Sequence, residues 1–334
     1  MKRKGNLYHR IATHENLCIA FAKAVRGKQD HPEVIAFRQD FDVNIRKLGD
    51  QLLTHRPDIG HYRFFQVCDP KIRQICAASF PERVLHHAMM NICEPILESY
   101  SISDSYACRK NKGNRKALLK ATEYAQKYDW YLKADIRKYF DSIDHNILMT
   151  LLSRRFKDKE VLELFQRVFN TYHTEHGKGV PIGNLLSQHS ANFYLGCLDH
   201  WVKEERGIRG YVRYMDDFIL FAHNKDVLKT ELGLIKEFLE KNLALQLKDN
   251  VQLNRCCRGI PFLGFRVYPH QIRLSPRSKQ RFIIKFREYE KKYVQGHWTE
   301  KELIAHIEPL IGFVKIANSS DFRRSVIQRF GVLS

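Results

Sequence analysis

The sequence predicts an α+β fold in which antiparallel hairpins alternate with helices and a helical segment comes last. Three stretches carry β-prone residues around turn residues, at 61–75, 210–223 and 259–268. Between and after them, apolar residues recur at the three- and four-residue spacing of amphipathic helices. A chain of 334 residues can bury a sizeable core and is expected to form roughly two or three subdomains.

The composition is strongly basic. Lys and Arg number 56 against 37 Asp and Glu, which gives a formal net charge of +19 and a pI of about 9.6. Such a charge favours a nucleic-acid partner, although a protein with an ordinary basic surface has the same balance. The eight cysteines show no Cys-x-x-Cys spacing and are expected to be reduced packing residues. No apolar run of membrane-spanning length and no signal peptide is recognised, so a cytoplasmic protein without a membrane partner is expected.

The N-terminal part reads as helices followed by a hairpin. Thr13 is expected to cap a helix that ends near Gly27, and apolar residues over 37–52 predict a second helix. The stretch 61–75 predicts two strands joined at Asp69-Pro70. Lys71 and Arg73 share one face of the returning strand, where they could meet a polyphosphate or act as edge-strand charges that block aggregation.

Two further segments precede the first candidate catalytic residue. A helix is expected after Ser79, which is a plausible cap, and the adjacent His86 and His87 favour packing over a metal pair. The next segment, 106–117, is a cationic loop around Gly113 ahead of a helix. Such a loop suits phosphate, although an ordinary exposed loop has the same composition. Its cations are Arg109, Lys110, Lys112, Arg115 and Lys116.

The middle of the chain carries carboxylates at the ends of predicted strands. The strand 130–134 delivers Asp135 at its end, and Phe140 follows after the chain has turned. Asp216 and Asp217 lie at the tip of the hairpin 210–223. A solvated turn that happens to contain two aspartates is the alternative for this pair alone. Two carboxylates this close repel each other unless a cation such as Mg²⁺ lies between them.

Glycine and proline open a helix after residue 177. Gly183 removes a side chain where another surface must approach, and Ser187 and Gln188 lie on the first turns of the helix. A helix over 227–242 and a strand over 243–247 are expected between the second and third hairpins.

The last part of the chain is predicted to be helical and basic. Ser275-Pro276 is a cap and first-turn proline, and a capping box at Thr299 opens another helix, which Pro309 is expected to interrupt. The first of these helices fits nucleic-acid backbone binding, or a solvated basic face. Its first cations are Arg277, Lys279, Arg281 and Lys285.

Carboxylates from two chain segments are what a two-metal phosphoryl-transfer site needs. Tyr214-Met215-Asp216-Asp217 resembles the signature of the reverse transcriptases, and Asp135 with Phe140 resembles their first catalytic motif. Phe262-Leu263-Gly264 resembles their primer-grip region. The likeness runs from about residue 61 to 268 in the family's order.

The resemblance implies a right-hand polymerase fold with fingers, palm and thumb. It implies that Asp135, Asp216 and Asp217 are catalytic and hold two Mg²⁺ ions, or Mn²⁺. Lys71, Arg73 and Arg109 would then meet the incoming dNTP, with Phe140 as steric gate against a 2′-hydroxyl. The implied parts are an N-terminal helical extension over 1–60, fingers over 61–130, palm over 131–150, a fingers and palm connection over 151–195, palm over 196–268 and thumb over 269–334.

The segment Ile182-Gly183-Asn184-Leu185-Leu186-Ser187-Gln188 departs from the usual Gln-Gly-x-x-x-Ser-Pro. It resembles the reverse transcriptases of diversity-generating retroelements, in bacteria, archaea or their phages. The resemblance implies errors directed at adenine. It also implies three partners, which are a structured template RNA, an RNA/cDNA duplex and a small, oligomeric accessory protein. Ile182 in place of a Gln amide is expected to relax mismatch rejection in the dNTP site, where Gly183 and Gln188 also lie.

Other functions stay open. Group II intron maturases, retron enzymes and an inactive RNA-binding relic are the alternatives, and the absence of a maturase extension argues against the first. About 60 residues follow the primer-grip region, so no RNase H or endonuclease domain is expected there. No lysine stands at the spacing that many polymerases use for a general acid, so Lys248 is only a candidate for that role.

Overall fold

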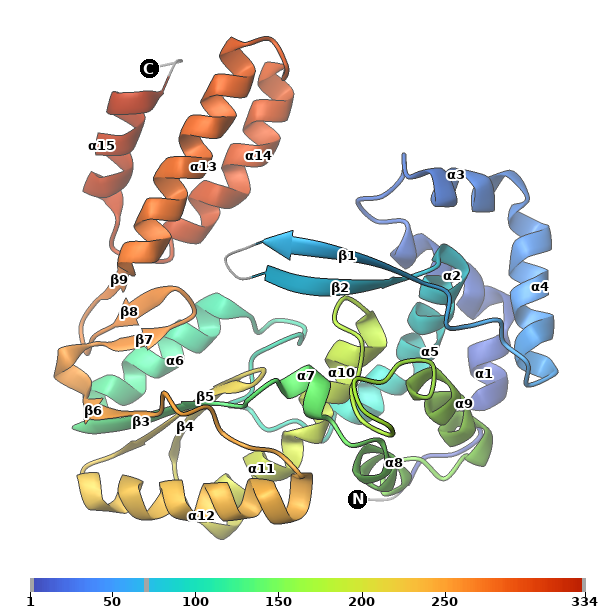
Figure 1. Ribbon diagram of the computed structural model, residues 1–334, viewed down its shortest axis with the longest axis horizontal. Coiled ribbons are helices and arrows are strands. Elements are labelled where there is room, and N and C mark those ends of the chain that lie inside the picture. Colours follow the sequence, from blue (N-terminus) through green and yellow to red (C-terminus); the bar gives the residue numbers. More distant parts are fainter. Residues whose placement is uncertain (1–2, 69–71, 332–334) are drawn as a thin grey trace. The chain divides into compact units, whose positions relative to one another are not determined.

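The structure is a computed structural model that describes residues 3–68 and 72–331 (Figure 1). The chain divides into two compact units. The first comprises residues 1–103, 135–206 and 234–249, and the second comprises 104–134, 207–233 and 250–334. Both mix helices with short strands.

The first unit is mainly helical and carries one two-stranded ribbon. The strands β1 (Tyr62–Cys68) and β2 (Ile72–Ala78) pair antiparallel, with Val67 opposite Arg73. Helix α2 packs on α5, and α10 packs on α5 and α8. The helices are α1 (Tyr8–Ala12), α2 (His14–Ala24), α3 (Pro32–Gln39), α4 (Phe41–Leu53), α5 (Phe80–Glu98), α7 (Tyr139–Ser142), α8 (His145–Ser153), α9 (Lys159–Phe169), α10 (Leu185–Tyr194) and α11 (Gly196–His200), which a π-helical turn (Trp201–Glu205) continues.

The second unit is built on a four-stranded sheet in the order β4-β5-β3-β6. These strands are β3 (Trp130–Asp135), β4 (Gly210–Tyr214), β5 (Asp217–Ala222) and β6 (Gln252–Arg255). A second, antiparallel sheet contains β7 (Ile260–Phe262), β8 (Phe265–Val267) and β9 (Ile272–Leu274). Helix α6 (Asn114–Lys127) contacts both β4 and β8.

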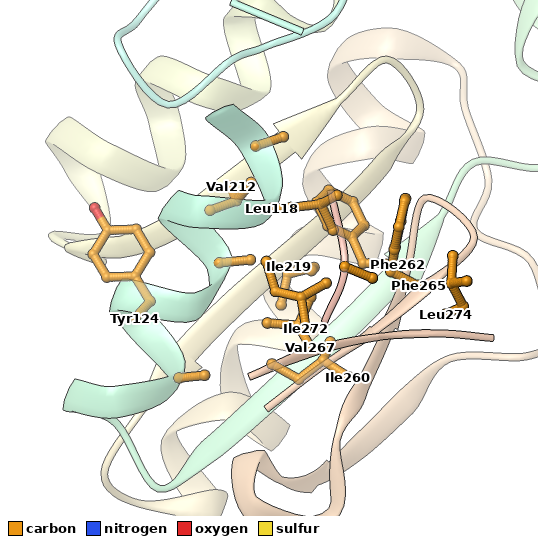
Figure 2. Close-up of a cluster of buried hydrophobic side chains, with 14 of the residues drawn as sticks. Leu118, Tyr124, Val212, Ile219, Ile260, Phe262, Phe265, Val267, Ile272 and Leu274 are labelled. Carbon is orange, nitrogen blue, oxygen red and sulfur yellow. The ribbon is translucent and has the colours of Figure 1, made fainter. Parts of the chain in front are cut away.

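Apolar residues from α6 and from both sheets form one core in the second unit. Figure 2 shows Leu118 of α6 beside Val212, Ile219, Phe262 and Phe265. All five side chains are buried. The strands that end in the predicted carboxylates are therefore held from one side by a packed apolar cluster.

Three helices, α13 (Pro276–Val294), α14 (Glu300–Val314) and α15 (Ser320–Phe330), follow the second sheet. Both α14 and α15 pack on α13, as Figure 1 shows. The predicted caps are confirmed, since the Ser275 hydroxyl accepts from the Ser278 amide and Thr299 forms a capping box with Glu302. The remaining helix α12 (Lys225–Leu243) begins in the second unit and ends in the first.

The predicted strand over 243–247 is wrong. Leu243 still belongs to α12, and Ala244 turns the chain in the left-handed region at φ 49°. The amide of Leu245 then donates to the carbonyl of Leu239, as at the end of a helix. Only an isolated bridge between Leu247 and Ile136 remains of the expected pairing.

Three other boundaries differ from expectation. The helix predicted over 37–52 is broken at Asp40, whose φ of −114° and ψ of 47° lie outside the helical region. Pro309 lies inside α14 and does not interrupt it, because the apolar face of that helix packs on α13. Ser79 is the N-cap residue of α5, but its side chain makes no capping hydrogen bond.

No helix in the described part of the chain combines the length and apolar character needed to cross a membrane. All eight cysteines are free thiols, as predicted.

Candidate functional site

The hairpin of β4 and β5 carries Asp216 and Asp217 as predicted. Tyr214 pairs with Asp217 and closes a turn formed by Met215 and Asp216. Met215 adopts φ 56°, in the left-handed region that side chains seldom occupy. Both strands pack their apolar residues into the core, so the turn carries the two half-buried carboxylates at the end of a rigid ribbon.

Arg213 supports this turn and was not predicted. Its side chain is almost fully buried, and its guanidinium donates to the carbonyl of Met215 over 2.9 Å. Its backbone amide donates to the carbonyl of Asp104, and its carbonyl accepts from the amide of Tyr106. A buried arginine fixed in this way holds the backbone of the turn. In the sequence it looks like one more charged residue of a basic chain.

Asp217 is paired with Lys133 of the neighbouring strand β3. The Lys133 Nζ lies 2.7 Å from the Asp217 Oδ1, and the two side chains are 16% and 21% exposed. At this distance an ammonium offsets much of the carboxylate's charge where water screens poorly. Lys133 was also missed, although a lysine in the apolar run of β3 was the signal.

Asp135 is the last residue of β3, as predicted. Within the first unit its Oδ1 lies 2.6 Å from the Nζ of Lys248. The amide of Lys248 also donates to the carbonyl of Asp135 over 2.8 Å. Two contacts therefore fix Lys248 against Asp135.

The hairpin supplies two neighbouring carboxylates, the donor type that a hard divalent cation takes. Asp135 and Asp217 each hold an ammonium group at 2.6 to 2.7 Å, so each already attracts a positive charge. Mg²⁺ takes one or two protein carboxylates and completes its shell with water and phosphate. Among the described residues, no group of three or more His, Cys, Asp or Glu side chains is arranged to hold an ion. The paired aspartates of the hairpin thus resemble the usual protein share of a Mg²⁺ site.

The first unit contains the predicted motifs around Phe140 and Ile182. The carbonyl of Ile182 accepts from the amide of Cys76 in β2 over 2.9 Å. A Cβ on Gly183 would lie 2.8 Å from the Cγ2 of Ile75, and its φ is 115°. Gly183 therefore permits the close approach that the sequence predicted. Ile182 is half-buried beside this junction.

Phe140 joins the same region through the backbone, because its carbonyl accepts from the amide of Val180 over 2.9 Å. Phe140 is half-buried on α7. Ser187 is buried and Gln188 half-buried on the first turns of α10, as expected. Phe140 is thus bonded to Val180, two residues before Ile182, and Ile182 in turn is bonded to β2.

The predicted phosphate-binding cations lie on several elements. Arg73 is exposed on β2, and Lys71 lies outside the described residues. In the second unit the guanidinium of Arg109 donates to the carbonyl of Ser105, and the Lys112 Nζ lies 5.0 Å from the centre of the Tyr106 ring. Gly113, at φ 91°, is the N-cap of α6 and provides no side-chain cap.

Two of the three predicted primer-grip residues, Leu263 and Gly264, form the turn between β7 and β8, and Phe262 ends β7. Phe262 is buried and belongs to the core in Figure 2. Leu263 and Gly264 have φ values of 51° and 85°, and the carbonyl of Gly264 accepts from the Ser278 hydroxyl over 2.6 Å. Leu263 and Gly264 are accessible at this turn, whereas Phe262 anchors it.

The basic residues of α13 are accessible. Arg277, Lys279 and Arg281 are exposed, and Lys285 is half-buried. Residues 277, 281 and 285 follow one another at four-residue intervals and so share one face of the helix.

The family model described as "Reverse transcriptase (RNA-dependent DNA polymerase)" matches residues 67–267, more than half of the chain. Among curated proteins, the chain is 25% identical over 279 residues to protein YkfC of Escherichia coli, covering 67% of this chain and 71% of that protein. It is 28% identical over 138 residues to the group II intron-encoded protein LtrA of Lactococcus lactis, covering 40% of this chain and 23% of LtrA.

Among solved structures, the chain is similar to apo telomerase from Candida tropicalis. The TM-score is 0.51 at 10% sequence identity, and the match covers 73% of this chain and 54% of that chain. Together with the match to the family model, this likeness supports the predicted α+β, right-hand polymerase fold.

Proposed function

The chain belongs to the reverse transcriptase (RNA-dependent DNA polymerase) family, and from that premise we propose that it copies a template-repeat RNA of a diversity-generating retroelement into cDNA. Its enzyme class is RNA-directed DNA polymerase. The lineage rests on one observation, the Ile182-Gly183 to Ser187-Gln188 segment in place of the usual glutamine-containing motif. Hydrogen bonding at the Ile182 carbonyl and the close packing at Gly183 support a role for this segment beside β2.

Asp135, Asp216 and Asp217 are the residues that would hold two Mg²⁺ ions, and Mn²⁺ could replace them. When bound, the ions activate the attacking hydroxyl and neutralise charge on the leaving pyrophosphate. The protein's own part is to present the carboxylates from rigid strands. Arg213 fixes the turn, and Lys133 neutralises Asp217.

The incoming dNTP is assigned to the residues that the family resemblance implies. Phe140 would exclude the 2′-hydroxyl, and Ile182, Gly183 and Gln188 would border the nascent pair. Arg73 and Arg109, together with Lys71, would meet the triphosphate, since arginine binds phosphate in a bidentate manner. The proposed subdomains are the N-terminal extension, fingers, palm and thumb with the boundaries predicted from the sequence.

We assign nucleic-acid binding to accessible residues of the β7–β8 turn, to Lys112 and to α13. Leu263 and Gly264 would contact the primer at the turn that Phe262 anchors. Lys112 and the cations of α13 would bind phosphates of the template RNA and of the RNA/cDNA duplex. A small, oligomeric accessory protein is a further proposed partner, on the retroelement resemblance alone.

A second candidate is a reverse transcriptase of the group II intron or retron kind. The similarity to LtrA favours a relation to group II intron-encoded proteins, although this chain spans less than a quarter of LtrA. The neighbouring DNA distinguishes the two candidates. A near-duplicate pair of repeats that differ at adenines supports the retroelement, whereas a surrounding intron contradicts it.

Primer extension on an RNA template with dNTPs and Mg²⁺ tests the catalytic assignment. Asp216→Ala is expected to abolish extension, since it removes one carboxylate of the pair, while Asp226→Ala on α12 serves as an exposed control. Extension by Asp216→Ala at the wild-type rate would contradict the metal assignment. Loss of extension in wild type as well would favour the inactive RNA-binding relic.

Sequencing of the cDNA tests the lineage assignment. Ile182→Gln restores an amide beside the nascent pair and is expected to lower misincorporation opposite template adenine, because polar sites reject mismatches more strongly than apolar ones. Leu185→Gln makes the same change on a half-buried residue at the start of α10 and should leave the error pattern unchanged. If Ile182→Gln and wild type misincorporate opposite template adenine at the same frequency, Ile182 does not set fidelity.

A further inference from the structure

A polar cavity of about 340 Å³ lies in the first unit, away from the predicted aspartates in the sequence. It is lined by the first residues of α3 and α5 and by the paired ends of β1 and β2. The polar groups on its wall are those of His31, Glu33, His61, Arg63, Ser79 and Arg83. Its volume lies at the lower end of the range for small-ligand sites.

Positive charge outweighs negative charge on this wall. Glu33 is the one acid among the lining residues, and its Oε2 lies 3.3 Å from the Nη2 of Arg83. Burial lowers the pKa of Arg83. The neighbouring Glu33 raises this pKa, whereas the positive charge of Arg63 lowers it further. The pKa of nearby Lys28 is lowered by burial and by Arg83. These cations therefore disfavour one another in the absence of a further anion.

Two buried nitrogen atoms of residues that line the cavity lack a protein partner. The Nε of Arg83 and the Nδ1 of His31 are inaccessible to solvent and make no hydrogen bond within the described residues. Buried polar atoms are nearly always paired in folded proteins, so these two atoms require an explanation. The guanidinium of Arg83 also packs over an aromatic ring, since it lies 5.2 Å from the ring centre of buried Phe80.

Two helices also begin at this cavity. His31 is the N-cap residue of α3 and Ser79 that of α5, and neither side chain caps its helix. Each helix has a proline in its first turn, Pro32 in α3 and Pro81 in α5, and proline has no amide hydrogen to donate. The two N-termini therefore contribute mainly their partial positive charge. Both add to the charge of the arginines, so the whole wall attracts an anion that can accept several hydrogen bonds.

We propose that this cavity binds a phosphate group. Phosphate offers several acceptor oxygens to Arg63 and Arg83, and its charge offsets the excess of cations and the partial positive charge of the two helix N-termini. The phosphate could belong to bound RNA or to a free phosphate compound. In either case the site is additional to the dNTP and metal residues, and it does not depend on the proposed polymerase function.

Titration calorimetry with inorganic phosphate tests the site on the full-length protein. Wild type is expected to bind phosphate, and Arg63→Gln and Arg83→Gln are each expected to weaken binding roughly tenfold or more. Arg38→Gln, an exposed arginine near the other end of α3, is the matched control and should bind as wild type does. Arg63 is exposed, so its variant answers the question even if Arg83→Gln fails to fold.

Absence of phosphate binding in wild type, or equal binding in all four proteins, would overturn the proposal.

A second arm identifies the source of the phosphate through binding of single-stranded RNA over a salt series. If Arg63 contacts an RNA phosphate, Arg63→Gln should make the slope of log K against log salt shallower by about 0.7 than that of Arg38→Gln. Phosphate binding with an unchanged RNA slope assigns the cavity to a free phosphate compound. Both arms measure binding, so a failure of polymerase activity does not affect them.

Discussion

At the scale of single residues, the most consequential contact is the one between Lys133 and Asp217. Both are less than a quarter exposed, so their 2.7 Å ion pair is more strongly coupled than pairs on the open surface. An ammonium here keeps the carboxylate oriented when no metal is bound. It also competes with any divalent ion for the same oxygen atoms.

Lys133→Met is therefore expected to destabilise the metal-free protein and to strengthen divalent-ion binding. Removing one partner of a partly buried pair costs about 1–3 kcal/mol, measurable by urea unfolding in chelator. Calorimetric titration with Mn²⁺ should give a lower Kd than wild type. The control is Lys120→Met, whose pair with Glu123 is also 2.7 Å long but has an acid that is 62% exposed. Equal behaviour of the two variants would show that burial of the Lys133 pair has no effect.

His86 provides a second test at this scale. It is fully buried on α5, and burial together with the neighbouring His87 lowers its pKa to about 3. Glu82, whose Oε1 lies 3.6 Å from the His86 Nε2, has its pKa raised by burial, which favours a neutral pair. The pKa of His86 is about 6.5 in the unfolded chain and about 3 in the folded protein. Between these two pH values, His86 binds a proton only when the protein unfolds. Stability contributed by neutral His86 is therefore lost as the pH falls through this window.

We expect the free energy of unfolding of wild type to fall by about 3 kcal/mol more than that of His86→Leu between pH 7 and 4. Leucine has no proton to bind, so the two urea-unfolding curves should approach each other as the pH falls. Glu82 acts in the opposite direction but is present in both proteins. Replacement of exposed His270 by leucine is the control and should preserve the wild-type pH dependence. Parallel pH profiles of wild type and His86→Leu would contradict the prediction.

At the scale of elements, the β7–β8 turn depends on backbone conformation as well as on side chains. Leu263 and Gly264 both have positive φ, the pattern of a type I′ hairpin. A Cβ on Gly264 would lie 2.9 Å from the Ser278 Oγ and 3.2 Å from the Cζ of Phe313. The turn is thereby fitted to α13 and α14.

Gly264→Ala is expected to destabilise the protein by about 1–2 kcal/mol, because alanine is strained at positive φ and meets two neighbours. The matched substitution is Gly233→Ala in α12, where no atom lies within 4 Å of the added Cβ. That change should stabilise by about 0.5–1 kcal/mol, since glycine is a poor helix former. Thermal unfolding of both variants checks the opposite signs. A shared sign would contradict the assigned turn geometry.

The sequence was sufficient where a local pattern determines the element. Asp135 at the end of an apolar strand and the Asp216-Asp217 turn between two such runs were both predictable. The pairing of Lys248 with Asp135 joins residues 113 positions apart and has no local signal. The leucines at 243, 245 and 247 alternate as in a strand, but alternation does not show the left-handed turn at Ala244. Long-range pairs and single backbone torsions therefore had to come from the structure.

At the scale of the whole molecule, the excess of 19 positive charges is the dominant property. The basic side chains on α13 lie on accessible surface, with Arg277, Lys279 and Arg281 exposed. Phosphate contacts release counterions, so RNA affinity should fall steeply with salt. With about six phosphate contacts, the slope of log K against log salt is expected to be about −4 for single-stranded RNA.

Replacing Arg277, Lys279, Arg281 and Lys285 by glutamine should make that slope shallower by about 3, since each lost contact contributes about 0.7. The matched variant removes four charges from α12, at Lys225, Lys229, Lys236 and Lys241. It has the same net charge but should retain a slope near that of wild type. Fluorescence anisotropy over a salt series separates the two cases. Equal slopes in both variants would mean that RNA responds to net charge alone, and the α13 surface would lose its assignment as a nucleic-acid contact.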